Sequence, residues 1–333
     1  MAQLLQEPEK DRPINPRPEL LVLRPPPVFT AFHHHFATKF QLIKPYESPL
    51  PTHVFLSAHA ASVEAVLCSG ASPITAAVLR LLPSLRLVVT ASAGVNHIDL
   101  PECRRRRIAV ANAGGVFSED VADVAVGLLI DVMRKVTAAD RFVRRRMWPT
   151  HGDYPLGSKL GDRRVGIVGL GSIGSEVAKR LESFGCIISY NSRTEKPSVP
   201  YAYHPTVYEL ASNCDVLIIC CALTDETRHM INKLVMSALG KEGIIINIAR
   251  GAIINEKELV EYLAQGEIAG AGLDVFENEP NVPKELFAMD NVVLMPHKAA
   301  FTEEAFFDAF RLVVDNLEAF FSNKPLLSQV IDE

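Results

Sequence analysis

The sequence predicts an α/β protein in which a doubly wound parallel sheet is combined with a second, smaller α/β domain. Three observations support this prediction. Short apolar runs alternate with helix-like segments along most of the chain, as in β-α-β units. The 333 residues exceed what one hydrophobic core usually holds and suit two domains. A Gly-x-Gly-x-x-Gly sequence lies between an apolar run and a helix-like segment.

The first 115 or so residues show this alternation on a modest scale. Their apolar runs include residues 19–23, 54–56 and 87–90, each of which we expect to form a strand. Apolar residues then recur at helical spacing over about residues 118–146, which predicts one long helix.

From residue 164 onward, apolar runs and helix-like segments alternate regularly. We expect strands over residues 164–168, 186–190, 215–221, 243–247, 269–273 and 291–295, and helices over residues 172–184, 255–263 and 302–321. The run 215–221 is almost entirely apolar, which is typical of a strand buried on both faces. Asn255, with Glu258 three residues later, and Thr302, followed by two glutamates, are helix-starting signals.

The last helix is expected to pack on the N-terminal part of the chain, which makes the smaller domain discontinuous. The predicted domains are therefore residues 1–117 with 299–333, and residues 118–298.

Composition excludes several classes of protein. The chain is 48% hydrophobic and 22% charged with a net charge of -5, so it has no electrostatic footprint for nucleic acid. The sequence contains no run of eighteen consecutive apolar residues, so no membrane span is expected. Residues 1–18 contain four prolines and no apolar core of a signal peptide, and residues 330–333 are not a peroxisomal address. We therefore expect a cytosolic protein.

Cysteine and histidine patterns give no metal site. The six cysteines lack zinc-ligand spacing and are expected to be buried, reduced thiols. The histidines at 33–35 and the arginine runs at 104–107 and 144–146 are interpreted as solvated or interface residues.

The glycine sequence from Gly169 to Gly174 is the first functional signal. It follows the strand 164–168 and opens a helix, where glycines allow a tight turn and close approach of the backbone to a pyrophosphate. The free amides and the dipole of the helix would hold that anion. This context predicts a dinucleotide cofactor.

The end of the next strand indicates which cofactor. An NAD site usually has an acid here, whereas this chain has Asn191, followed by Ser192, Arg193 and Thr194. A guanidinium and two hydroxyls would bind the 2′-phosphate that a carboxylate would repel. We therefore expect NADPH, with NADH as a weaker cofactor. The alternative is that Arg193 is simply a solvated loop residue.

Three ionisable residues follow later strands. Doubly wound sheets bind ligands at the carboxyl ends of their strands, where Arg250, Glu279 and His297 are expected. Reduction of a 2-oxo acid needs a proton donor and a cation that orients the substrate. Arg250 can bind the carboxylate and carbonyl oxygens, and His297 can be the general acid, with Glu279 favouring its imidazolium form.

The chain resembles the D-isomer-specific 2-hydroxyacid dehydrogenases, above all plant glyoxylate/hydroxypyruvate and hydroxyphenylpyruvate reductases. The motifs that carry the resemblance are Ala93-Gly-Val-Asn-His-Ile-Asp99, Gly169-Leu-Gly-Ser-Ile-Gly174, Leu223-Thr-Asp-Glu-Thr-Arg-His-Met-Ile231, Asn247-Ile-Ala-Arg-Gly251, Gly272-Leu-Asp-Val-Phe-Glu-Asn-Glu-Pro280 and Pro296-His297. The resemblance implies a Rossmann cofactor domain inserted into a smaller, flavodoxin-like substrate domain. It also implies a catalytic triad of Arg250, Glu279 and His297.

The resemblance further implies a set of ligand contacts. The implied cofactor contacts are Val121, Gly169, Leu170, Gly171, Ser172, Ile173, Gly174, Ser192, Arg193, Thr194, Cys221, Ala222, Leu223, Thr227, Ile248, Ala249, Asp274 and Ala299. The implied substrate contacts are the backbone amides of Ser92, Ala93 and Gly94, with Arg250, His297 and Trp148. Leu56 and Ser57 are expected to line the pocket, because we expect a strand to end there.

Other features of the resemblance leave questions open. The family is typically dimeric, and Trp148 matches a tryptophan that can approach the active site of a neighbouring subunit. Ala299 and Ala300 stand where the family often has Gly-Ser, and Ala222 where Pro is common, which puts fine ligand contacts in doubt. Whether the 2-oxo acid is small or aromatic stays open. A dinucleotide-sensing, corepressor-like binding module is the alternative to an enzyme.

Overall fold

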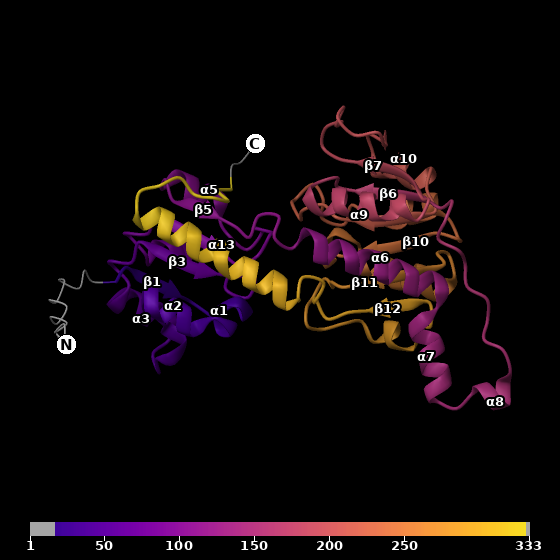
Figure 1. Cartoon of the computed structure of the whole chain (residues 1–333), viewed down its shortest axis with the longest axis horizontal. Coiled ribbons are helices and arrows are strands. Elements are labelled where there is room, and N and C mark those ends of the chain that lie inside the picture. Colours follow the sequence, from indigo (N-terminus) through magenta and orange to yellow (C-terminus); the bar gives the residue numbers. More distant parts are fainter. Residues whose placement is uncertain (1–16, 331–333) are drawn as a thin grey trace, which may run out of the picture. The chain divides into compact units, whose positions relative to one another are not determined.

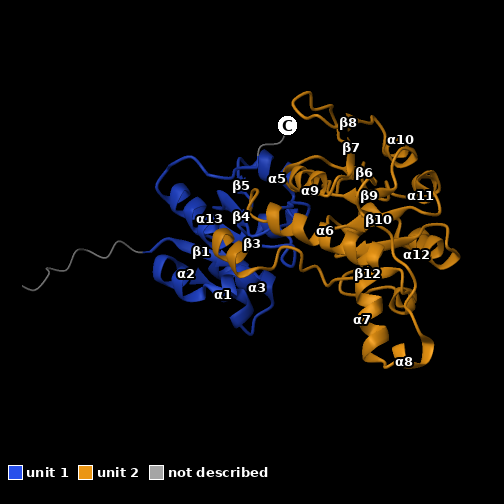
Figure 2. Cartoon of the chain, turned by 45° about the vertical axis from the view of Figure 1, so that its right-hand side comes forward, with its two compact units in different colours: residues 1–112, 310–333 blue, residues 113–309 orange. Residues whose placement is uncertain are grey.

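The chain forms two compact units in the computed structural model, which describes residues 17–330 (Figure 2). Unit 1 is Met1–Asn112 with Phe310–Glu333, and unit 2 is Ala113–Ala309. These limits lie five and eleven residues away from the domain limits expected above, and the existence of two separately folding domains stays a prediction. The expectations for the two chain ends fall mainly on residues 1–16 and 331–333, outside the described residues.

Unit 1 contains a parallel sheet of five strands in the order β2-β1-β3-β4-β5. The strands are β1 Glu19–Val22, β2 Gln41–Ile43, β3 Ala65–Cys68, β4 Leu87–Thr90 and β5 Ala109–Ala111. This is the flavodoxin-like strand order. Every residue of β3 and β4 is buried, so the runs of β-branched and apolar residues form the centre of this core.

The helices of unit 1 correct one expectation. They are α1 Pro27–Ala31, α2 His33–Lys39, η1 Pro45–Glu47, α3 Thr52–His59, α4 Ala76–Arg80, α5 Leu100–Arg105 and the end of α13 Glu303–Phe321. The strand expected at residues 54–56 is wrong, because these residues lie in α3, where the amides of Val54 and Phe55 both donate to the Pro51 carbonyl. Three apolar residues in a row cannot distinguish a strand from a buried helix.

Unit 2 contains a parallel sheet of seven strands in the order β12-β11-β10-β9-β6-β7-β8. The strands are β6 Arg164–Val168, β7 Ile187–Asn191, β8 Ala202–Tyr203, β9 Val216–Ile219, β10 Ile244–Asn247, β11 Gly270–Leu273 and β12 Val292–Leu294. The six longest match the expected strands to within two residues at either end. The two parallel sheets confirm the predicted fold class.

Helices cover both faces of this sheet, as expected for a doubly wound fold (Figures 1 and 2). The helices of unit 2 are α6 Ser118–Arg134, α7 Val136–Arg144, α8 Trp148–His151, α9 Ser172–Ser183, α10 Val207–Ser212, α11 Lys233–Leu239 and α12 Glu256–Gln265, with the short turns η2 Gly251–Ile253 and η3 Lys284–Ala288. Of these, α7 and α8 extend away from the sheet. α6 and α9 lie on one side, and α10, α11 and α12 on the other.

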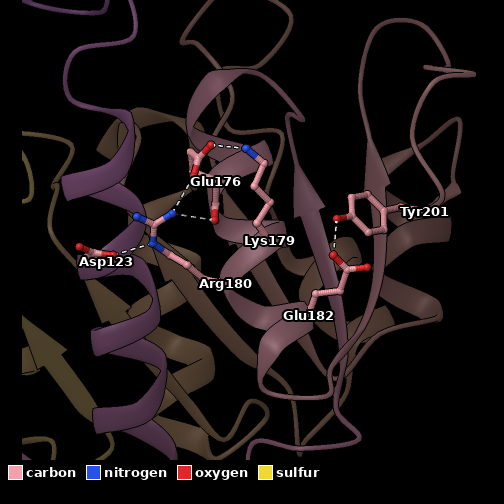
Figure 3. Close-up of polar contacts among 6 residues, drawn as sticks. All are labelled: Asp123, Glu176, Lys179, Arg180, Glu182 and Tyr201. Atoms are coloured by element: carbon pink, nitrogen blue, oxygen red, sulfur yellow. Dashed lines mark hydrogen bonds and ion pairs between the residues drawn. The ribbon is translucent and has the colours of Figure 1, made fainter.

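An ion pair between Arg180 and Asp123 joins α9 to α6, and a second one, between Arg180 and Glu176, lies within α9 (Figure 3). Arg180 of α9 donates from Nε to Asp123 Oδ1 of α6, at 2.5 Å, and from Nη1 to Glu176 Oε2, at 2.8 Å. Arg180 is about three quarters buried, so these bonds are less screened than bonds at an open surface. The contacts fix the helix that follows the glycine loop.

The helix expected over residues 118–146 is interrupted. Lys135 adopts a left-handed conformation with φ +58° and separates α6 from α7. The carboxylate of Asp131 accepts the amide of Thr137 at 2.7 Å and also its hydroxyl. This cap stabilises the break, and helical periodicity alone does not reveal it.

The expected helix starts are present. The Asn255 side chain accepts the Glu258 amide, and the Thr302 hydroxyl accepts the Ala305 amide. Glu258 does not return a bond to Asn255 as in a capping box. Its carboxylate accepts the amide of Lys233 instead, at 2.7 Å. The cap therefore also ties α12 to α11.

None of the six cysteines, all of which the structure describes, forms a disulfide, and the expected burial holds for four of them. Cys68, Cys103, Cys186 and Cys214 are buried, and Cys220 and Cys221 are partly exposed. Burial raises the pKa of the Cys68 thiol to about 12.

None of the helices formed by residues 17–330 is long and apolar enough to cross a membrane.

Candidate active site

The functional residues expected in unit 2 follow strands that end at one edge of its sheet. All neighbouring strands are parallel, so the loops after β6, β9, β10, β11 and β12 leave from the same edge. The chain runs from β6 to β7 on one side and then to β9 on the other. Ligands bind doubly wound sheets at such a switch point.

The glycine loop after β6 leaves room for a ligand on one side only. A Cβ at Gly169, where φ is +94°, would lie 2.7 Å from the Cys221 backbone, and one at Gly174 would lie 2.2 Å from the Gly169 carbonyl. A Cβ at Gly171 would meet nothing within 4 Å. Two glycines are therefore required by packing, while the third borders open space at the start of α9. This geometry fits a pyrophosphate held by backbone amides.

Loops beside the glycine loop are held by their own side chains. Asn191 donates through Nδ2 to the His204 carbonyl at 2.9 Å, and the Ser192 hydroxyl donates to the Thr194 carbonyl at 2.6 Å. The Thr227 hydroxyl donates to the Ala222 carbonyl at 2.8 Å. Asn191 thus has a structural role, while the side chain of Arg193 is exposed.

The turn after β10 holds Arg250. Asn247 is fully buried, and its side chain accepts the Ala249 amide and donates to the Arg250 carbonyl, both at 3.1 Å. Arg250 donates through Nη1 to the Ala249 carbonyl at 2.6 Å. Burial lowers the pKa of the guanidinium, and the charge of Glu279 acts in the opposite direction. This interaction brings two expected catalytic residues into one electrostatic site.

Gly251 presses the turn of Arg250 against the loop after β11. A Cβ at this position would lie 1.9 Å from the Phe276 carbonyl carbon and 2.3 Å from the Glu277 nitrogen. These are backbone atoms, so the strain could not be relieved by a side-chain rotation.

Replacing Gly251 with Ala is therefore expected to lower the free energy of unfolding by about 1–3 kcal/mol through overpacking. Urea denaturation would measure it. Gly70→Ala is the control, because a Cβ at Gly70 would meet nothing within 4 Å. If both variants unfolded like the wild type, the close approach at Gly251 would not be required.

Glu279 and His297 form an imidazole–carboxylate pair. His297 Nδ1 lies 2.8 Å from Glu279 Oε2, while Glu279 Oε1 accepts the Phe276 amide at 3.1 Å. Burial alone would raise the pKa of Glu279, but the bonds from His297 and Phe276 and the charges of His297 and Arg250 leave it below its usual value. An ionised Glu279 requires hydrogen on Nδ1, so Nε2 is the nitrogen that can face a substrate.

Asp274 holds the loop that carries His297. Its carbonyl accepts the His297 amide at 2.8 Å, and its two carboxylate oxygens accept the amides of Lys298, at 2.8 Å, and Ala299, at 3.0 Å. Asp274 is 1% exposed, so three successive amides are fixed by one buried residue. Its expected contact with the cofactor stays a prediction.

A second imidazole–carboxylate pair, which the sequence did not predict, joins the segment after β9 to the loop after β11 that also carries Glu279. His229 Nε2 is 2.7 Å from Glu277 Oε1, and the Glu277 amide donates to Glu256 at 3.0 Å. Burial raises the pKa of Glu256. The available signals were that His229 and Glu277 both lie within family motifs, but the sequence does not show that they touch.

The remaining expected ligand contacts belong to unit 1 or lie on helices of unit 2. Ser92, Ala93, Gly94 and Leu56 belong to unit 1. Leu56 lies within helix α3 and is 1% exposed, so the strand end expected at this residue is wrong. Thr90 accepts the Ser92 amide at 3.3 Å. Val121 is buried in α6, and Trp148 of α8 is 59% exposed. Their roles toward ligands stay predictions.

Comparison with known proteins identifies the family. Residues 126–299 match the family described as D-isomer specific 2-hydroxyacid dehydrogenase, NAD binding domain. The chain is 53% identical to glyoxylate/hydroxypyruvate reductase HPR3 of Arabidopsis thaliana over 94% of this chain and 97% of that protein. It is 44% identical to the hydroxyphenylpyruvate reductase of Plectranthus scutellarioides, over 92% and 97% respectively.

A solved structure agrees with these relatives. The NADPH-dependent glyoxylate/hydroxypyruvate reductase of Sinorhizobium meliloti, in complex with NADP and malonate, superposes with a TM-score of 0.86. It is 36% identical, and the match covers 94% of this chain and 97% of that one. The chain described here therefore belongs to the D-isomer-specific 2-hydroxyacid dehydrogenases and is an oxidoreductase of that family.

Proposed function

We propose that the protein is an NADPH-dependent reductase that converts a 2-oxo acid into a D-2-hydroxy acid. The observation that supports this most strongly is the 2.8 Å contact between His297 and Glu279, at the sheet edge that also holds Arg250 and the glycine loop. An acid, its partner carboxylate and a substrate-orienting cation are thereby available beside a dinucleotide site.

Each catalytic residue has one proposed task. The cofactor, when bound, supplies a hydride to the substrate carbonyl carbon. Arg250 binds the carbonyl and carboxylate oxygens and stabilises the negative charge that grows on the carbonyl oxygen. His297 donates its Nε2 proton to that oxygen, and Glu279 stabilises the imidazolium before transfer and fixes the ring. The glycine loop and the start of α9 would bind the pyrophosphate.

The substrate proposed is glyoxylate, hydroxypyruvate or 4-hydroxyphenylpyruvate, from the names of the relatives. Initial rates with these acids, pyruvate and phenylpyruvate at saturating NADPH would rank them by kcat/KM. The proposal expects measurable NADPH oxidation with at least one of the three. Turnover with none of the five acids would contradict it. A cytosolic location stays a prediction from the sequence.

The preference for NADPH gives a prediction for Arg193. We expect a lower KM for NADPH than for NADH, and we expect Arg193→Ala to narrow the ratio about 5- to 30-fold, because an exposed charged hydrogen bond to the 2′-phosphate is lost. Steady-state kinetics with both cofactors measures this. A wild type that prefers NADH, or an unchanged ratio in the variant, would contradict it.

We further propose that the active form is a homodimer. The segment formed by α7, α8 and the residues that follow is an arm of unit 2 (Figure 1). Its exposed apolar side chains include Val136, Val143, Trp148 and Leu156. Leu156 is 92% exposed. A cavity of about 540 Å³ between α6, α7, η3 and β12 lies beside this arm, and its lining combines apolar residues such as Leu286 with the charged residues Asp131 and Arg141. Exposed apolar side chains that gather on one segment are typical of protein interfaces.

The dimer is tested by light scattering after gel filtration. The wild type is expected to have twice the mass of the chain, and Val143→Asp with Leu156→Asp to shift it toward the monomer by placing charges in the interface. Leu234→Asp is the control, because Leu234 is 64% exposed on α11, away from the arm. A monomeric wild type would rule out the dimer.

A further inference from the structure

Lys196 is held at both ends beside the glycine loop, although no motif pointed to it. Its backbone amide donates to the hydroxyl of Tyr190 at 2.7 Å, and Tyr190 is fully buried at the end of β7. Its ammonium donates from Nζ to the carbonyl of Leu170 at 2.6 Å. Leu170 lies between Gly169 and Gly171. The lysine therefore joins the loop after β7 to the loop after β6.

This ammonium retains capacity to bind an anion. An ammonium has three donors, and the Leu170 carbonyl accepts from one of them. Among the described residues, the Lys196 ammonium forms no ion pair with a carboxylate. The side chain is half-buried, so its position is more fixed than that of an open surface lysine. Two donors and a full positive charge are thus available next to the glycine loop.

The neighbourhood points to a particular anion. In doubly wound sheets the adenosine ribose lies between the glycine loop and the end of the second strand. These are the two segments that Lys196 connects. A phosphate at the 2′ position of that ribose is a phosphomonoester with about two negative charges, which are best neutralised by more than one cation. Arg193, three residues before, is the other cation of this loop.

We infer that Lys196 is a second specificity-determining residue, whose ammonium binds the 2′-phosphate of NADPH together with Arg193. The inference rests on the proposed NADPH-dependent function. A comparison of NADPH with NADH distinguishes this role from mere support of the loop, because the two cofactors share every group except this phosphate. Loss of a loop support would weaken binding of both.

The test compares the two cofactors in three variants. Dissociation constants for NADPH and NADH are measured by cofactor fluorescence with the full-length protein and Lys196→Met, Lys196→Arg and Lys179→Met. Lys196→Met is expected to raise the Kd for NADPH about 10-fold or more, the effect of a charged hydrogen bond, and to change the Kd for NADH less than about threefold. Lys196→Arg should restore most of the affinity, because it keeps the charge.

Lys179→Met is the matched control. Lys179 lies on α9, which follows the glycine loop, and pairs with Glu176 at 2.6 Å (Figure 3). This variant should leave both constants unchanged. Competition by 2′,5′-ADP and by 5′-AMP gives a second reading, in which only 2′,5′-ADP should bind more weakly to Lys196→Met.

Each of the other possible outcomes contradicts either the role of Lys196 or the proposed function. Equal weakening for NADPH and NADH would make Lys196 a support of the loop or a ligand of the shared pyrophosphate. An unchanged Kd for NADPH would remove it from the site. A wild type that binds NADH more tightly than NADPH would contradict the proposed function itself. The role of Lys196 would still be tested independently, by the difference between the binding of 2′,5′-ADP and that of 5′-AMP.

Discussion

Replacing His297 with Gln is expected to lower kcat for 2-oxo acid reduction by about 10²–10⁴-fold, the usual contribution of a positioned general acid. Gln keeps a polar side chain of similar reach but cannot donate a proton from an imidazolium. The Kd for NADPH should stay close to that of the wild type, because the proposed role of His297 concerns proton transfer. Rapid-mixing and steady-state kinetics would separate the effect on kcat from the effect on NADPH binding. A variant with a near-normal kcat would show that another group donates the proton.

The partner carboxylate gives a distinct pH signature. Glu279 has a lowered pKa, so it is ionised at neutral pH and stabilises the protonated form of His297. In Glu279→Gln the negative charge that favours an imidazolium at this position is absent. Reduction needs the protonated ring, so the alkaline limb of kcat/KM should move to lower pH. An unchanged profile in this variant would mean that the 2.8 Å pair is not coupled to the reaction.

Replacing Arg250 with Lys is expected to lower kcat/KM by about 10²–10³-fold, or roughly 2.7–4 kcal/mol of transition-state stabilisation. A 2-oxo acid presents two coplanar oxygens, which match a planar guanidinium but not an ammonium. KM should rise because the substrate carboxylate is bound less well, and kcat should fall because charge on the carbonyl oxygen is stabilised less. The fold should persist, since the turn is held by Asn247 through backbone contacts.

A titration with NADPH provides the control for this variant. Arg250→Lys should bind the cofactor like the wild type and show unchanged circular dichroism. If it also kept a near-normal kcat/KM, Arg250 would be a structural residue of the turn, and the proposed substrate orientation would be wrong.

The sequence predicted the sheet of unit 2 better than the helices. Strands buried on both faces are continuous apolar runs, so β9 and β10 could be recognised from residue type alone. The short run at residues 54–56 could not, because it lacks a period. The break at Lys135 depends on a cap between Asp131 and Thr137, which is visible only once the chain has turned.

The sequence predicts those residues of the candidate site that come after strands. Arg250, Glu279 and His297 could be placed at one edge because parallel strands end together. The partners of a side chain could not be deduced, because they lie far away in the sequence. His229 and Glu277 are 48 residues apart, and Lys196 and Leu170 are 26 apart. The bonds that hold the His297 loop on Asp274 likewise join two different strand ends.

The most direct test of the central proposal is the reduction of hydroxypyruvate with NADPH, followed by chiral analysis of the glycerate formed. The proposal predicts that NADPH is consumed in a one-to-one ratio with D-glycerate, and that His297→Gln binds NADPH but forms almost no product. NADPH binding without turnover of any 2-oxo acid would contradict an enzymatic role and favour a dinucleotide-sensing binding module. Formation of L-glycerate would contradict the proposed stereochemistry.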